Sequence, residues 1–343
     1  MKECSLGDLI AFQRGHDLPK TSMIPGEYPV VGSNGIIGYH NEFTTEAPSI
    51  SVGRSGNVGN PFIYYGRTWS HNTSLYVKEF KDCDPVFMYY LLKTLDLGNY
   101  AGGSAVPTLN RNHIHSLSVI VPDDIEDQER IACVLRMLDE KIELNQQIND
   151  NLQQQAQAIY ASMFIDNADP AWEQGHLSDL ITVKYGKDHK KLADGSYPVY
   201  GSGGVMRHVE RPLYDKESVL IPRKGTLNNV MYVNQPFWSV DTMFYTEMRL
   251  PNVAKFVYHF VKAKDLASMN AGSAVPSMTT DILNAMEVAI PSASALEEFE
   301  ALVSPMYKTM QENDNQSETL AKLRDALLPK LMSGEIDVSG IQL

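Results

Sequence analysis

The chain consists largely of two copies of one sequence. YPVVGSNG beginning at Tyr28 returns as YPVYGSGG beginning at Tyr197, and the pentapeptide GSAVP at 103–107 returns at 272–276. Both pairs are 169 residues apart, so the repeat runs between them without net insertion or deletion. A long repeat present only twice predicts two homologous domains in tandem, and it argues against a solenoid or a propeller, which need more copies.

Each copy is followed by a segment with a heptad pattern. Apolar residues alternate at spacings of four and three over 131–163 and again over 299–331. A helix of about 33 residues is about 50 Å long and marginally stable alone, so we expect the two to pack as an antiparallel coiled coil. Independent surface helices are the alternative. The predicted seam residues are Leu135, Leu138, Ile142, Asn145, Leu152, Val303, Met306, Met310, Asn313 and Leu320.

Within each copy the pattern is mixed. Short runs such as SISV, PFIYY and TSLYV predict strands separated by glycine-rich turns. Asp84-Pro85 predicts a helix at 84–97 with proline at its first position, and Pro251 is expected to open its counterpart. We therefore predict an α+β fold. Its expected segments are a first domain at 1–122, a central helix at 123–166, a second domain at 167–291, and a C-terminal helix and tail at 292–343.

The net charge of −13 is distributed unevenly along the chain. Residues 1–122 carry 9 basic and 10 acidic residues, and 167–291 carry 13 of each. The excess of acid lies in the helical segments, with 3 basic against 10 acidic residues in 123–166 and 4 against 9 in 292–343. The overall charge argues against a nucleic-acid partner, but the near-neutral domains do not.

The cysteines and the hydropathy of the chain indicate the cellular compartment in which we expect the protein. Cys4, Cys83 and Cys133 are odd in number and lack the spacing of metal ligands, which favours a reducing cytoplasm. No stretch approaches the roughly 18 apolar residues of a membrane span, so we expect no membrane partner.

Local patterns that could suggest an enzyme or a metal site are weak. Asp139-x-Lys141 fits a loose nuclease pattern, but that site needs a strand and here the residues fall on a heptad helix. Asn60-Pro61-Phe62 is similar to a methyltransferase turn but lacks its second proline. His113 and His115 could lie on one strand face, without a third ligand at a convincing spacing. We therefore predict no catalytic residue and no metal ligand.

The order of these features resembles the specificity subunit of type I restriction–modification systems. The markers are the Tyr-Pro-x-x-Gly-Ser turns, the Trp-Ser segments ahead of a threonine, the GSAVP turn, and the acidic run IEDQERI that enters the first long helix. One departure is the second acidic run, ALEEFE, which lacks the glutamine usual in the family. The chain is also short for that family.

The resemblance implies a role in host defence. Each globular domain would be a target-recognition domain reading one half of a bipartite double-stranded DNA target, and the antiparallel helices would set the unread gap. The chain itself would be non-catalytic and would hold no cofactor. Two methyltransferase subunits and the restriction subunits would be its partners, and they would bring S-adenosylmethionine, ATP and magnesium.

A comparison of the two copies also suggests roles for individual residues. If the two domains read different sequences, identical residues are scaffold or position the DNA backbone, and differing residues read bases. GSAVP is then structural, and Arg54 and Arg223 are candidates for phosphate contacts. The base-reading candidates are Ser55, Asn57, His71, Asn72, Asn110 and Arg111 in the first copy, and Lys224, Thr226, Asn228, Thr279 and Thr280 in the second.

Two other classes of function remain open from the residues alone. One is a tandem β-rich adaptor that binds protein or glycan, and the other is a nuclease or methyltransferase in its own right. Salt-dependent DNA binding that requires a methyltransferase partner would favour the recognition subunit over the adaptor, whereas adenine methylation by the chain alone would favour the enzyme.

Overall fold

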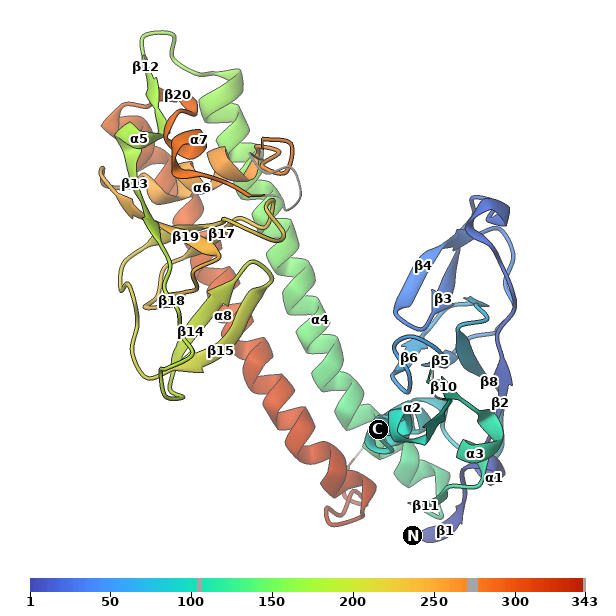
Figure 1. Ribbon diagram of the computed structural model, residues 1–343. Coiled ribbons are helices and arrows are strands. Elements are labelled where there is room, and N and C mark those ends of the chain that lie inside the picture. Colours follow the sequence, from blue (N-terminus) through green and yellow to red (C-terminus); the bar gives the residue numbers. More distant parts are fainter. Residues whose placement is uncertain (104–106, 270–276, 342–343) are drawn as a thin grey trace. The chain divides into compact units, whose positions relative to one another are not determined.

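The computed structural model describes residues 1–103, 107–269 and 277–341 (Figure 1). The chain forms two compact units, which do not follow one another along the sequence. The first unit comprises Met1–Gln146 and Asp314–Leu343, and the second comprises Gln147–Asn313. Each unit therefore contains one copy of the repeat and one part of each long helical segment, and the units cut across the four segments expected from the sequence.

Both units contain the same two sheets. A four-stranded antiparallel sheet has the order β2-β8-β5-β6 in the first unit and β13-β19-β16-β17 in the second. A three-stranded sheet has the order β4-β3-β7 and β15-β14-β18, with the short third strand parallel to the central one. The first unit's strands are β2 (Ile10–Arg14), β3 (Tyr28–Gly32), β4 (Gly35–His40), β5 (Ser49–Gly53), β6 (Pro61–Tyr64), β7 (Trp69–Ser70) and β8 (Ser74–Phe80). The second unit's strands are β13 (Ile181–Tyr185), β14 (Tyr197–Gly201), β15 (Gly204–Val209), β16 (Ser218–Pro222), β17 (Met231–Val233), β18 (Trp238–Ser239) and β19 (Met243–Met248). The runs SISV, PFIYY and TSLYV predicted as strands coincide with β5, β6 and β8.

The two ends of each repeat pair with each other. β1 (Lys2–Ser5) is antiparallel to β11 (Ser118–Val121), and β12 (Glu173–His176) is antiparallel to β20 (Glu287–Ile290). The remaining short elements are α1 (Leu6–Leu9), η1 (Lys20–Ser22), η2 (Leu97–Tyr100), β9 (Ala101–Gly102), β10 (Thr108–Leu109) and α5 (Leu177–Leu180). The pairing of its first and last strands therefore brings the two ends of each repeat together.

The helices inside each repeat confirm the predicted start of the first helix. They correct the predicted start of its counterpart and the strand expected at His113 and His115. Helix α2 (Pro85–Thr94) begins with the predicted proline, and the Asp84 side chain caps it by accepting the Phe87 amide at 2.6 Å. Its counterpart α6 (Ala254–Lys262) begins three residues after Pro251, so the predicted start is wrong. Asn252 adopts a left-handed conformation with φ 57°, which puts Pro251 in a turn ahead of the helix.

The second correction concerns the short helices before β11 and β20. These are α3 (Arg111–His115) and α7 (Thr280–Asn284). His113 and His115 belong to α3, so the expected strand face does not exist. The ring of His115 accepts the amide of Phe12 at 2.9 Å, which gives this histidine a structural role between α3 and β2.

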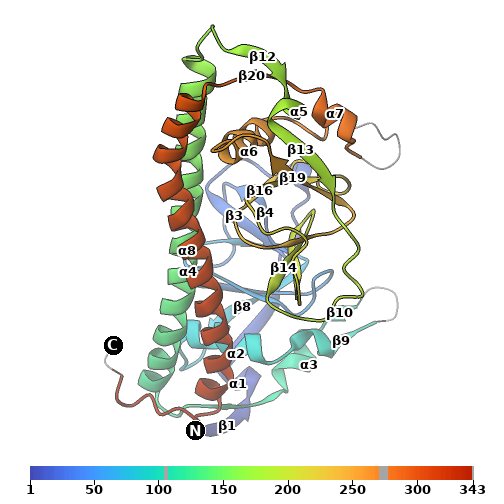
Figure 2. The same ribbon diagram turned by 90° about the vertical axis from the view of Figure 1, so that its left-hand side faces the viewer.

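The long helices are α4 (Ile125–Ala161), followed by a π-helical turn at Ser162–Asp166, and α8 (Ala293–Met332). Both are longer than the heptad pattern predicted. They run side by side in opposite directions (Figure 2). In the first unit Arg324 of α8 contacts Asp139 of α4, and in the second unit Asn313 contacts Asn149. The packing is that of an antiparallel coiled coil, as expected.

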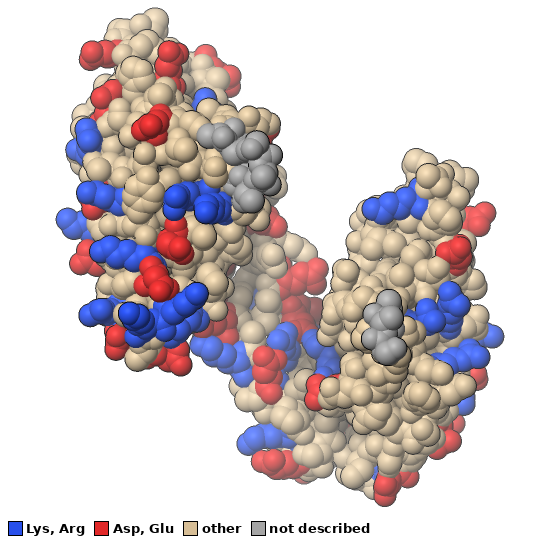
Figure 3. All heavy atoms as spheres, in the orientation of Figure 1, with Lys and Arg blue, Asp and Glu red and all other residues tan. Residues whose placement is uncertain are grey.

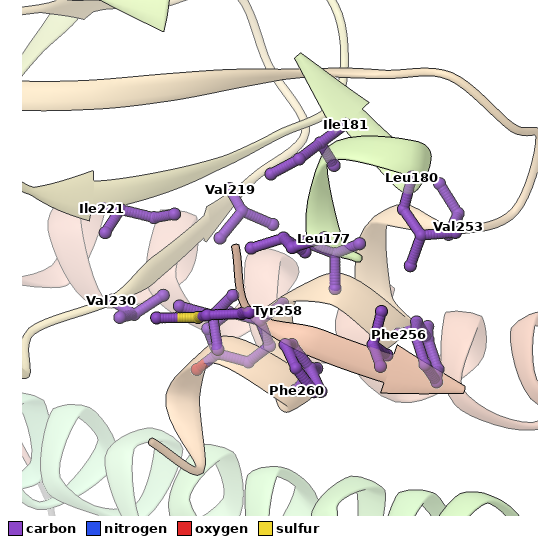
Figure 4. Packing of buried hydrophobic residues seen from close by; sticks show 14 of the residues in the cluster. Leu177, Leu180, Ile181, Val219, Ile221, Val230, Val253, Phe256, Tyr258 and Phe260 are labelled. Atoms are coloured by element: carbon purple, nitrogen blue, oxygen red, sulfur yellow. The ribbon is translucent and has the colours of Figure 1, made fainter. Parts of the chain in front are cut away.

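Each repeat packs onto its part of the helix pair through the same helix. In the first unit, Phe87 and Leu91 of α2 share a buried cluster with Leu135 of α4 and Leu331 of α8. In the second unit, α6 supplies Phe256 and Phe260 to a cluster that also contains residues of α4 and α8 (Figure 4). The helix pair is therefore part of each domain's hydrophobic core.

Candidate nucleic-acid interface

The turn that follows β5 carries Arg54 and is hydrogen-bonded on two sides. The amides of Arg54 and Ser55 donate to the carbonyl of Thr73 at 2.8 and 3.2 Å, which ties the turn to the start of β8. The carbonyl of Arg54 accepts the amide of Leu109 at 2.9 Å, which ties it to the segment before α3. The turn and the start of α3 are therefore adjacent, although they are more than 50 residues apart in sequence.

The second unit repeats this construction. The amides of Arg223 and Lys224 donate to the carbonyl of Thr242 at 2.9 and 3.2 Å, and the amide of Met278 donates to the carbonyl of Arg223 at 2.9 Å. Lys224 also forms a β-bridge with Ser277, just before α7. The two arginine turns therefore have the same hydrogen-bonded frame.

The two guanidinium groups are also anchored alike. Nη1 of Arg54 donates to the carbonyl of Asn72, and Nη1 of Arg223 to the carbonyl of Asp241, both at 3.4 Å. Burial, and to a smaller degree the charge of Arg14, lower the pKa of Arg54 from its usual value. The guanidinium groups of the two identical arginines are therefore held by the same type of contact in both units.

In the first unit the arginine turn borders a groove of about 680 Å³. The residues that line it are Gln13, Arg14, Arg54, Leu75, Gly102, Thr108, Leu109, Asn110, Arg111 and His113. Three arginines and no carboxylate belong to this set, which makes the groove complementary to an anion. It brings together three predicted residues, Arg54, Asn110 and Arg111, and adds Arg14, which the sequence did not single out.

Two of the predicted base readers cap helices. The Asn110 side chain accepts the amide of Asn112 at 3.0 Å at the start of α3, and the Thr279 hydroxyl accepts the amide of Ile282 at 3.3 Å at the start of α7. Caps use the side-chain oxygen as acceptor. The Asn110 amide nitrogen and the Thr279 hydroxyl proton are therefore the groups suited to donate to a base.

Other predicted readers bond to neighbours in their own unit. Asn72 donates to Asp17, and the His71 ring lies 3.0 Å from the Thr73 hydroxyl. In the 53–59 turn, the Asn57 side chain accepts from Asn60 at 2.5 Å. These bonds orient the side chains and use part of their hydrogen-bonding capacity.

Asn228 is the most constrained of the candidates. Its amide nitrogen donates to Asp265 at 3.0 Å and its amide oxygen accepts the amide of Ala267 at 2.9 Å. Both ends of the side chain thus join two loops of the second unit. Among the other second-unit candidates, Lys224 and Thr226 are exposed, and Thr280 is half-buried at the first position of α7.

Basic and acidic side chains are intermixed on the visible face of both units, with a group of Lys and Arg on the second unit near β14 and β15 (Figure 3). The loop between β13 and β14 also carries the exposed side chains of Lys187, Lys190 and Lys191. The even charge balance of each repeat therefore hides local concentrations of positive charge.

The ten predicted seam residues are all buried or half-buried. In the first unit, Asn145 donates to Gln316 at 2.9 Å and to the hydroxyl of Ser317 at 3.1 Å. In the second unit, Asn313 donates to Asn149 at 2.8 Å. The seam thus contains one polar layer in each unit, where the sequence indicated one asparagine in each helix.

Asp139 contacts two other helices of the first unit. It lies 2.6 Å from Nη1 of Arg324 and accepts the Tyr90 hydroxyl at 2.8 Å, so it links α4 to α8 and to α2. Lys141 is also on α4. The nuclease-like pattern therefore falls on a helix, as the sequence indicated, and its carboxylate forms an ion pair.

Across the residues that the structure describes, no three His, Cys, Asp or Glu side chains are grouped as metal ligands. Within the same ranges no helix combines the length and hydropathy needed to cross a bilayer. The first GSAVP lies partly, at 104–106, and the second wholly, at 272–276, outside the described residues. The structural role expected for this pentapeptide is therefore not described.

Two homologous domains with matching arginine turns, joined to an antiparallel helix pair, define a two-domain recognition protein. The family model "Type I restriction modification DNA specificity domain" matches the chain twice, at residues 1–154 and 170–321. The chain belongs to this family. It is therefore a non-catalytic DNA-specificity subunit, which works with other subunits of a type I restriction–modification system, and the adaptor and stand-alone enzyme alternatives are not favoured.

Individual relatives are similar along much of their length. The type I restriction enzyme MjaIX specificity subunit of Methanocaldococcus jannaschii is 24% identical over 299 residues, which cover 74% of this chain and 69% of that protein. A putative type I specificity subunit of Mycoplasma pneumoniae is 25% identical over 357 residues, covering 95% and 94%. The crystal structure of a type I S subunit from M. genitalium superimposes with a TM-score of 0.68 at 20% identity, covering 96% of both chains, which shows the same fold.

Proposed function

We propose that each unit reads one half of a bipartite double-stranded DNA target, and that the chain thereby directs adenine methylation or restriction by its partner subunits. The observation that carries this proposal is the arginine turn, which has the same frame in both units and is flanked by residues that differ. A shared frame suits contacts to the DNA backbone, which carry no sequence information, and differing neighbours suit contacts to bases.

The base contacts are assigned to the exposed and half-exposed positions around each turn. In the first unit these are Arg111, Asn110 and Ser55, and in the second they are Lys224, Thr279 and Thr280. Arginine reads guanine through two hydrogen bonds, whereas threonine makes one bond or contacts the thymine methyl group. Because Arg111 and Thr280 occupy equivalent positions after the helix caps, they would give the two half-sites different sequences.

The helix pair is assigned to subunit assembly and to spacing. Its helices carry the acidic excess of the chain, which suits a protein-binding surface better than a DNA-binding one. Two methyltransferase subunits would bind there, and restriction subunits would join the complex. S-adenosylmethionine, ATP and magnesium would be held by these partners, in the reducing cytoplasm that the three free cysteines favour.

Methylome sequencing of a host that expresses the chain with its modification subunits tests the proposal. We expect a bipartite methylated site that disappears without the chain. Replacing Arg111 by its counterpart, Arg111→Thr, should change the first half-site and leave the second unchanged. The matched control is Lys78→Thr, an exposed cation on β8 of the same unit, which should leave both half-sites unchanged. Methylation that is independent of the chain, or a change in both half-sites from Arg111→Thr, would contradict the proposal.

A further inference from the structure

The first unit places a second arginine beside Arg54 by strand register. Arg14 of β2 lies opposite Leu75 of β8, and Leu75 lies opposite Val52 of β5. Residues that are opposite one another in a sheet, and residues two apart along a strand, point to the same face. Arg14, at the end of β2, therefore lies next to Leu75. Arg54, in the turn that follows β5, lines the same groove as Arg14 and Leu75, and it lies close enough to Arg14 to be affected by its charge.

The second unit has the same register with different residues. Tyr185 of β13 lies opposite Phe244 of β19, Phe244 lies opposite Ile221 of β16, and Arg223 is two residues after Ile221. Tyr185 is therefore the counterpart of Arg14, and Phe244 is the counterpart of Leu75. The arginine common to both units has a cation beside it in one unit and an aromatic ring in the other.

The two neighbours have different physical effects. In the second unit the guanidinium of Arg223 lies 5.4 Å from the centre of the Tyr185 ring, and that ring contacts Phe244 edge-on at 5.1 Å. The cation is thus already stabilised by a protein group. In the first unit the charge of Arg14 acts on Arg54 in the direction that disfavours its protonated form. Like charges held close together are stabilised when an anion binds between them.

The groove of the first unit supplies no such anion itself. Its lining contains no carboxylate, and among the described residues no Asp or Glu lies within ion-pair distance of Arg14, Arg54 or Arg111. Guanidinium groups are well suited to phosphate oxygens because they donate parallel hydrogen bonds. On DNA, the anion of this kind is the backbone phosphate.

We propose that Arg14 and Arg54 form a two-arginine phosphate site in the first unit, and that the second unit replaces it with the Tyr185–Arg223 pair and makes one phosphate contact fewer there. Arg14 is then a positioning residue for DNA that carries no sequence information. The proposal rests on the proposed function, because it concerns how the recognition domains hold the DNA backbone.

The experiment exchanges the two neighbours. The full chain, assembled with its modification subunits, carries Arg14→Tyr or Tyr185→Arg, and affinity for a duplex containing the target site is measured against salt concentration. One phosphate contact contributes about 0.9 to the slope of log affinity against log salt. We expect Arg14→Tyr to reduce the slope by about 0.9 and Tyr185→Arg to increase it by a similar amount, with both methylated half-sites unchanged.

Two further variants separate charge from folding. Arg14→Lys keeps the cation and should keep the wild-type slope. Arg249→Gln removes an exposed arginine of the second unit whose guanidinium donates to Thr182 at 3.1 Å, and it should leave the slope unchanged.

The outcomes separate this inference from the proposed function. If neither Arg14→Tyr nor Tyr185→Arg alters the slope, the inference is overturned, whereas specific binding by the wild type would still support the proposed function. A changed first half-site in Arg14→Tyr would also overturn the inference, because Arg14 would then read a base. Loss of specific, salt-dependent binding in the wild-type complex would overturn both proposals.

Discussion

Asn145 of α4 is completely buried and donates from its amide to the hydroxyl of Ser317 of α8 at 3.1 Å. In the second unit, Asn313 and Asn149 form the matching layer at 2.8 Å. The two layers are related by the duplication, since Asn145 and Asn313 occupy equivalent positions and so do Asn149 and Ser317. A polar layer in an apolar seam fixes the register of the helices at some cost in stability. The same register is thus specified once in each unit.

The Asn149–Asn313 layer should behave as a coupled pair. Removing one side of a buried hydrogen bond costs about 1–3 kcal/mol, whereas replacing both sides with apolar groups can be nearly neutral. The Asn149–Asn313 bond is half-buried, so each single loss should lie at the lower end of this range. We expect Asn149→Leu and Asn313→Leu each to destabilise the protein, and the double variant to be more stable than the sum of the two losses predicts. Denaturant unfolding of all four proteins measures the coupling. Costs that simply add would show that the two side chains do not interact.

Leu135 should be among the most sensitive residues of the helix pair. It is completely buried between the helices and the first unit's core, whereas Met137 on the same helix is 62% exposed. Leu135→Ala removes buried methyl groups and leaves a cavity, at a cost of about 2–5 kcal/mol. Met137→Ala is the matched control and should cost less than about 0.5 kcal/mol. Equal losses in denaturant unfolding would mean that the seam is not packed as described.

Asn110 allows capping to be separated from DNA binding. Aspartate caps a helix about as well as asparagine, so Asn110→Asp should leave stability unchanged, whereas Asn110→Ala should cost about 1 kcal/mol. The new carboxylate would lie in the groove of three arginines, so Asn110→Asp should weaken DNA binding by the assembled complex. Thermal unfolding and a binding isotherm on the same sample report the two effects. Unweakened binding by Asn110→Asp would show that this groove does not face the DNA.

His259 should make the second unit sensitive to acid. Its ring is buried between Gln157 at 2.8 Å and the Tyr307 hydroxyl at 2.9 Å, and burial lowers its pKa to about 4. An unfolded histidine has a pKa of about 6.5, so the unfolded chain takes up a proton more readily than the folded one as the pH falls. The stability contributed by the neutral ring is therefore complete above about pH 6.5 and is lost as the pH falls towards 4, by about 3 kcal/mol.

Denaturant unfolding between pH 4 and pH 7 measures this loss. His259→Gln keeps a polar side chain without a titrating ring and should flatten the pH dependence, whereas His208→Gln, at an exposed histidine, should leave it unchanged. An equally steep loss of stability in His259→Gln would assign the acid sensitivity to other groups.

The parts of the fold that the sequence could predict are those with a local or repeated signal. The strand runs, the proline start of α2 and the heptad seams are patterns within one segment, and the duplication shows each of them twice. The predicted start of α6 was wrong because proline favours turns as well as helix starts. Asn252 adopts a left-handed conformation, which asparagine tolerates, and Pro251 therefore belongs to a turn. The base-reader candidates Asn110 and Thr279 did carry a sequence signal for capping, since asparagine and threonine are preferred immediately before a helix.

The parts that could not be predicted depend on pairings between distant segments. Arg14 meets Arg54 only because β2 and β5 both pair with β8, and periodicity does not give strand order. Asn228 was a candidate for reading bases because it differs between the two copies, but Asp265 and the Ala267 amide bind both ends of its side chain from another loop. The contacts of a turn residue are set by the segment that folds against it, and the sequence of the turn does not identify that segment.

The proposed spacing role of the helices predicts the effect of a longer pair. The unit boundaries fall between the two polar layers, after Gln146 in α4 and after Asn313 in α8. One heptad with leucine at its seam positions, inserted at both points, keeps Asn145 opposite Ser317 and Asn149 opposite Asn313. Seven residues add about 10.5 Å, which corresponds to about three base pairs at 3.4 Å each.

Methylome sequencing should then show both original half-sites separated by a longer unread gap. Because DNA has 10–10.5 base pairs per turn, three base pairs also rotate one half-site by about 100° relative to the other, so the new gap can settle at a neighbouring whole number. A heptad inserted in α4 alone is the control, since it mismatches the seam and should abolish methylation. If the paired insertion changes the sequence of a half-site while the gap stays fixed, the helices do not set the spacing and the division of labour between domains and helices is wrong.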